Sequence, residues 1–99
     1  MIDSLRWSRL SFAQQMGHIG SEIARACHWE KENDLVSRDQ ALERALELLD
    51  LTLDTTQRTA RLKEIARLRE VVAAWYARQK IYDIDAAALE NYCISFSRH

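Results

Sequence analysis

FAQQMGHIGSEIARAC, the segment from Phe12 to Cys27, carries two different stripes of side chains at helical spacing. Large apolar residues recur along the first stripe: Phe12, Met16, Ile19 and Ile23. Residues with almost no side chain recur along the second: Ala13, Gly17, Gly20 and Ala24. The first stripe has the period of a helix face that packs on a core. Because Gly inside a helix costs about 1 kcal/mol relative to Ala, the second predicts a close contact with another helix.

The composition favours long helices in one small domain. The chain has 99 residues, of which 47% are hydrophobic and 29% charged, with no Pro and two Gly. Such a chain has little material for tight turns or strand breaks, and it is rich in the strong helix formers Ala, Leu, Glu and Arg. We therefore predict an all-α protein in which residues 1–99 form a single helical-bundle domain.

The charges of the chain are nearly balanced, with 14 Lys and Arg against 15 Asp and Glu and a net charge of -1. A balanced chain has no overall field that attracts nucleic acid or an acidic membrane. No apolar run has the length of a signal peptide or of a membrane span. We therefore expect a cytoplasmic protein without a nucleic-acid partner and without membrane association. Cys27 and Cys93 lack CxxC spacing, which predicts small, semi-buried residues rather than a disulfide or a thiolate metal site.

Apolar periodicity and capping residues predict four helices. The first begins at Asp3 or Ser4 and runs to about Glu30, and a polar loop follows it. Ser37, followed three residues later by Gln40, is typical of a capping box at the start of the second helix, although Leu35 and Val36 can already be helical. The predicted ranges are about 3–30, 37–53, 56–79 and, for a short last helix starting at Asp83 or Asp85, up to Phe96. Short connections predict an antiparallel helical bundle of three long helices plus a shorter C-terminal helix.

The same periodicity predicts the core and the charged contacts between helices. The residues predicted to form the core are Phe12, Met16, Ile19, Ile23, Leu42, Ala45, Leu46, Leu49, Leu62, Ile65, Leu68, Val72 and Trp75. The second helix has an acidic line: Glu43, Glu47, Asp50 and Asp54. The first half of the third helix is rich in Arg and Lys, which predicts ion pairs between these two helices.

Two groups of side chains have the residue types of a chemical site. Glu43, Glu47 and Asp50 can project as carboxylates for Mg²⁺ or Mn²⁺, although the EExxE element that accompanies ExxD in all-α nucleotide pyrophosphohydrolases does not occur in this chain. His18 and Glu22 stand four residues apart on the first helix. With Arg25 on the same face, they form either a polar site or a structural contact across an interface.

Other catalytic patterns are missing from the sequence. No Ser or Cys stands in a nucleophile motif, and no glycine-rich loop suited to phosphate is present. The helical ribonucleases of the HEPN type use Arg followed four to six residues later by His, and none of the three histidines follows an Arg at those distances. The sequence therefore predicts no catalytic residue and no cofactor.

Three stretches resemble a group of short bacterial helical proteins: MGHIGSEIARACHW (residues 16–29), ALERALELLDLTLD (residues 41–54) and RLKEIARLRE (residues 61–70). The resemblance implies a compact helical protein that occurs as a stand-alone product. It implies no catalytic residues, because none are known for that group. Gly17, Gly20 and Ser21 lie in its most distinctive part.

These observations favour a non-enzymatic interaction module, a homodimer in which the stripe of Ala13, Gly17, Gly20 and Ala24 packs closely against a second copy. The small residues can instead seat the second helix within one subunit. One alternative function is a divalent-metal-dependent nucleotide or phosphate-ester hydrolase built on Glu43, Glu47 and Asp50, assisted by His18 or Glu22. Another is a small partner of a toxin or regulator encoded nearby.

Overall fold

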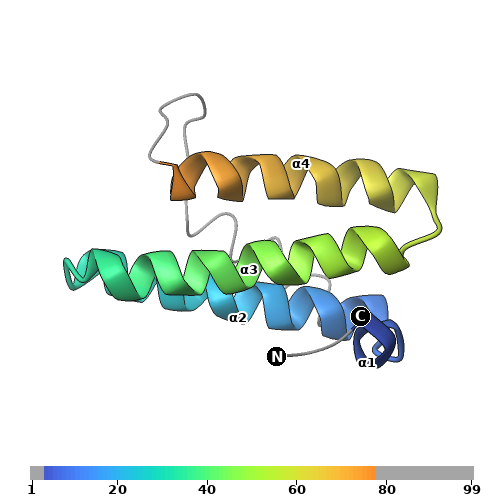
Figure 1. The fold of residues 1–99 in the computed structure, drawn as a ribbon, viewed down its shortest axis with the longest axis horizontal. Helices are drawn as coiled ribbons and strands as arrows, with labels where there is room; N and C mark the ends of the chain where they lie inside the picture. The colour runs from blue at the N-terminus through green and yellow to red at the C-terminus, as the bar shows by residue number, and fades with distance from the viewer. Residues whose placement is uncertain (1–3, 78–99) are drawn as a thin grey trace.

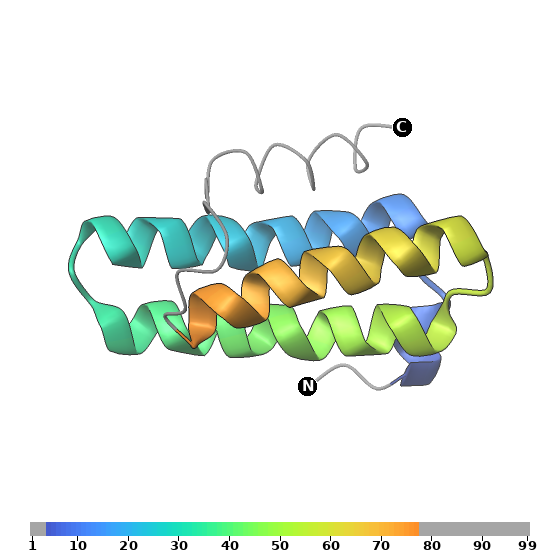
Figure 2. The ribbon, with the colours of Figure 1, turned by 90° about the horizontal axis from the view of Figure 1, so that it is seen from above.

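The computed structural model describes residues 4–77, and this part of the chain is all-helical (Figure 1). It comprises a short helix α1 (Ser4–Ser8) and three long helices, α2 (Phe12–Lys31), α3 (Leu35–Thr55) and α4 (Thr59–Tyr76). Helix α3 packs against α2, α4 and α1. The long helices run antiparallel to their neighbours in sequence (Figures 1 and 2). The predicted fold class is confirmed, while the predicted C-terminal helix and the end of the third helix at Gln79 lie outside the described residues.

The first helix does not run unbroken to Glu30 as predicted, because the chain turns between α1 and α2. Ser11 is the N-cap of α2 and forms a capping box with Gln14, in which each side chain bonds the other residue's backbone N–H at 3.1 and 2.9 Å. The turn directs Trp7 into the core, where its indole Nε1 donates to Thr52 Oγ1 of α3 at 2.9 Å. Both side chains are fully buried, so this bond fixes α1 on α3.

The predicted capping box at Ser37 is wrong, because α3 begins two residues earlier and is capped by Asp34. Asp34 accepts from the backbone N–H of Ser37 at 3.0 Å and from its hydroxyl at 2.8 Å. Just before it, Asn33 adopts a positive φ of 58°, which Asn tolerates better than most residues. The Asp34 N–H then donates to Trp29 O, which closes a tight turn between α2 and α3.

The core follows the predicted helix faces closely. The predicted residues that are buried are Met16, Ile19, Ile23, Leu42, Ala45, Leu49, Ile65, Leu68, Val72 and Trp75. Phe12 and Leu46 are partly buried against this cluster, and Leu62 is half-buried. The prediction missed Trp7, Ala26 and Ala41, which are fully buried. No helix in residues 4–77 is both long enough and apolar enough to cross a bilayer.

Candidate functional site: a charged pocket between α2 and α3

The three residues of the predicted polar site lie at one pocket, which also has lining residues from α3. His18, Glu22 and Arg25 of α2 lie at a pocket of about 270 Å³. The remaining residues of its lining are Ser21, Arg44, Glu47 and Leu48. The predicted spacing therefore gathers these side chains on one side of α2, and the register of α2 against α3 adds an arginine and a second carboxylate.

Glu22 is the centre of this pocket. Its side chain is only 10% exposed, and its two carboxylate oxygens accept from Arg25 Nη1 and, at 2.8 Å, from Arg44 Nε. A buried carboxylate is costly unless it is paired and hydrogen-bonded, and here two guanidinium groups satisfy both oxygens. Arg25 belongs to the same helix and Arg44 to α3, so the contact joins α2 to α3 as well as neutralising the carboxylate.

His18 does not act on Glu22 in this arrangement. It is exposed and packs its ring against Trp7, with 5.8 Å between the ring centroids. Within the described part of the chain, His18 forms no hydrogen bond to Glu22, which is bound to two arginines instead. A general base whose imidazole is oriented by a carboxylate is therefore not assembled in this pocket.

The three carboxylates of the metal-site alternative have different surroundings. Glu43 accepts from Tyr76 Oη at 2.7 Å, and Asp50 binds Arg69, while Glu47 lines the charged pocket. The hydrogen bond that Arg69 donates to the Asp50 carboxylate is the main cause that raises the pKa of Arg69 above its ordinary value. The pair of Asp50 and Arg69 also confirms one predicted ion pair between the second and third long helices.

Metal ligands must converge on one ion, and these carboxylates do not. In the region from residue 4 to residue 77, no group of three or more His, Cys, Asp or Glu side chains is placed to hold a metal ion. Glu22 in turn accepts from two arginines. The geometry of the described residues therefore offers no support for the hydrolase alternative.

The stripe of small residues on α2, which we call the small stripe, consists of Ala13, Gly17, Gly20 and Ala24 and lies away from the charged pocket. Gly20 and Glu22 are two residues apart, which separates them by about 200° around the helix axis. Since Glu22 contacts Arg44 of α3, Gly20 lies on the side of α2 remote from that contact. Gly20 is buried, whereas Ala13, Gly17 and Ala24 are half-buried.

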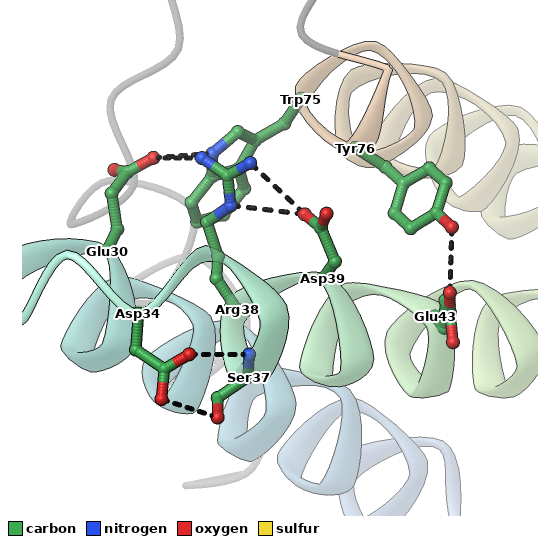
Figure 3. Close-up of polar contacts among 8 residues, drawn as sticks. All are labelled: Glu30, Asp34, Ser37, Arg38, Asp39, Glu43, Trp75 and Tyr76. Atoms are coloured by element: carbon green, nitrogen blue, oxygen red, sulfur yellow. Dashed lines mark hydrogen bonds and ion pairs between the residues drawn. The ribbon is translucent and has the colours of Figure 1, made fainter.

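Sequence reasoning missed a second polar cluster, at the end of the bundle where α2 meets α3 (Figure 3). Arg38 is only 5% exposed and donates to Glu30 Oε1 of α2 at 3.0 Å and to Asp39 Oδ1 at 3.1 and 3.2 Å. Trp75 Nε1 of α4 donates to the same Glu30 oxygen at 3.1 Å. The cluster ties three helices together, and no pattern within one helix reveals it.

Comparison of the chain with protein-family models, with curated proteins and with solved structures finds no match.

Proposed function

We propose that this protein is a non-enzymatic interaction module that forms a homodimer through the small stripe of α2. The observation that carries the proposal is the position of the stripe, on a side of α2 remote from the Glu22–Arg44 contact, with three of its four residues still partly exposed. A helix surface without side chains allows a second backbone to approach closely. Of the carboxylates on which the hydrolase alternative relied, Glu22 and Asp50 bind arginines and Glu43 accepts from Tyr76.

The backbone of α2 does not require its glycines. Neither Gly17 nor Gly20 has a positive φ, and both lie well inside the helix. Glycine is unfavourable at such positions, so conformational freedom cannot be the reason for its presence. The missing side chain is the remaining physical reason, which supports a close packing contact at this surface.

The order of the small residues suits a second copy of the same chain. The stripe reads Ala, Gly, Gly, Ala with intervals of four, three and four residues, so it is the same in both directions. A twofold axis at its centre would pair Ala13 of one copy with Ala24 of the other, and both are half-buried in the single chain. Self-complementary surfaces of this kind form isologous contacts between antiparallel helices.

The exposure of the two glycines gives two distinct tests. Gly17 is half-buried, so leucine at Gly17 would project from the surface of α2 and obstruct a second helix. Gly20 is buried, so leucine there would also collide with its own subunit. Gly17→Leu should therefore abolish association with little loss of helicity, whereas Gly20→Leu should lower the melting temperature as well.

Sedimentation equilibrium and light scattering would measure the association. We expect the wild type to show twice the chain mass of 11.6 kDa, and Gly17→Leu to show the mass of one chain. Ala66→Leu is the matched control, since Ala66 is an exposed small residue on α4 and its replacement should leave the dimer intact. A monomeric wild type, or a Gly17→Leu variant that stays dimeric, would overturn the proposal.

A further inference from the structure

The α1–α2 turn and the α3–α4 connection lie at the same end of the bundle, opposite the α2–α3 turn (Figures 1 and 2). A second cavity lies between them. Its volume is about 320 Å³, at the lower end of the roughly 300–1,000 Å³ typical of small-molecule sites. Residues of both connections and of the adjoining helix ends form its lining: Ser8, Leu10, Phe12, Gln15, Thr55, Thr56, Gln57, Arg58 and Arg61. The polar groups are hydroxyls, amides and two guanidinium groups, and the lining includes no carboxylate.

The two arginines of this cavity differ from the four arginines of the described residues that bind carboxylates. Arg25, Arg38, Arg44 and Arg69 each bind a carboxylate. Arg58 and Arg61, by contrast, form no ion pair with any residue between 4 and 77. Instead, the guanidinium carbon of Arg61 lies 4.4 Å from the centroid of the Phe12 ring. Stacking of this kind orients the guanidinium plane while its N–H donors stay available for an anion.

The start of α4 has two positively charged side chains, where negative charge would stabilise the helix. Arg58 is the N-cap of α4 and provides no side-chain hydrogen bond to the first turn, unlike Ser11 at α2 and Asp34 at α3. A helix N-terminus carries a partial positive charge, so cations there are destabilising. Arg58 and Arg61 are also like charges three residues apart, which adds to the repulsion. A bound anion would interact favourably with the helix N-terminus and would offset the repulsion between the two arginines.

We propose that this cavity binds the phosphate group of a small ligand, held by Arg58 and Arg61 at the uncapped start of α4. Guanidinium groups bind phosphate oxygens through paired, charge-assisted hydrogen bonds. The first N–H in α4 that bonds within the helix is that of Leu62, to Arg58 O at 3.0 Å, so the N–H groups of Thr59, Ala60 and Arg61 lie at the open N-terminus of this helix. The remaining volume admits a small organic group. The proposal is independent of the dimer contact of α2.

NMR titration of the ¹⁵N-labelled full chain would test the site, with inorganic phosphate and ribose 5-phosphate as probes at constant ionic strength. We expect saturable shifts of the backbone amide signals of Thr59, Ala60 and Arg61. Arg58→Gln and Arg61→Gln should each weaken binding about tenfold, because each removes a charge-assisted contact. Lys63→Gln removes the same charge from an exposed α4 residue outside the lining and should leave affinity unchanged.

The two probes distinguish the source of the phosphate. Equal affinity would show that the cavity recognises the phosphate group alone, and tighter binding of ribose 5-phosphate would show that it also holds the organic part. The proposal fails if neither probe gives saturable shifts, or if Lys63→Gln weakens binding as much as the two cavity variants do. Circular-dichroism melts of every variant would establish that it is folded at the titration temperature.

Discussion

Thr52→Val removes one hydroxyl from the centre of the bundle and gives a sharp test of how α1 is held. Thr52 Oγ1 accepts from Trp7 Nε1 at 2.9 Å and donates to Leu48 O at 2.7 Å, and both Trp7 and Thr52 are fully buried. Valine has nearly the same shape, so the change leaves a buried indole N–H without an acceptor. That penalty is about 1–3 kcal/mol. For a domain of this size, about 2 kcal/mol lowers Tm by about 8–16 °C.

Thr55→Val is the matched control. Thr55 lies on the same helix and is half-buried, and its hydroxyl donates to Leu51 O at 2.9 Å without accepting from an indole. Its replacement should change the free energy of unfolding by no more than about 0.5 kcal/mol. Urea unfolding followed by circular dichroism would measure both variants. If Thr52→Val and Thr55→Val have equal effects, the buried bond does not hold α1.

A double-mutant cycle with Trp7→Phe isolates the pair. Phenylalanine removes the indole donor, so Thr52→Val should cost at most about 0.5 kcal/mol in that background. Trp7→Phe alone is expected to be destabilising, because it also removes buried volume. A cost of Thr52→Val that is the same in both backgrounds would show that loss of the Leu48 contact, rather than the unpaired indole, explains the effect.

Three further predictions concern the helix starts and the buried arginine. Asp34→Ala should lower Tm at neutral pH, because it removes the N-cap of α3. Hydrogen bonds from Ser37 lower the pKa of Asp34 below its ordinary value of 3.8. The difference in Tm from wild type should therefore persist above pH 3.8 and disappear only as the pH falls through the lowered pKa. Arg38→Met should cost about 1 kcal/mol and Arg38→Ala about 2–3 kcal/mol in urea unfolding, because methionine preserves the packing of the buried stem; equal losses would contradict this. Arg58→Asp should raise Tm by supplying the missing N-cap, yet abolish phosphate binding in the NMR titration.

The helix positions were largely predictable because the apolar residues repeat with a helical period. The break between α1 and α2 was not, since apolar residues continue through it. The four-residue pattern Ser-x-x-Gln occurs twice, at Ser11 and at Ser37, and it forms a capping box only at Ser11. At the second position, Asp34 supplies a carboxylate acceptor three residues earlier. The pattern therefore identifies a residue that can serve as an N-cap. Whether it does so depends on whether a neighbouring residue, such as Asp34, supplies a better acceptor.

Only the part of the candidate site that lies on a single helix was predictable from the sequence. The spacing of His18, Glu22 and Arg25 places them along one side of α2, and in the structure they line one pocket. The contribution of Arg44 depends on the register between α2 and α3, which is set by core packing over the whole length of both helices. No local pattern contains that register, and the same holds for the buried position of Arg38.

The starts of the three long helices show how differently this chain uses similar positions. Helices α2 and α3 begin with side chains that accept from their first turns, as the partial positive charge of a helix start favours. Helix α4 has an arginine, Arg58, at its N-cap and a second one, Arg61, three residues later. The chain has 15 acidic residues, so carboxylates were available for pairing, but none lines this cavity. This arrangement lowers the stability of the fold and concentrates hydrogen-bond donors in a cavity. Such a combination is typical of binding sites, in which residues that favour ligand binding often destabilise the folded protein. The same physical argument therefore predicts that one substitution at Arg58 strengthens the fold and weakens the site.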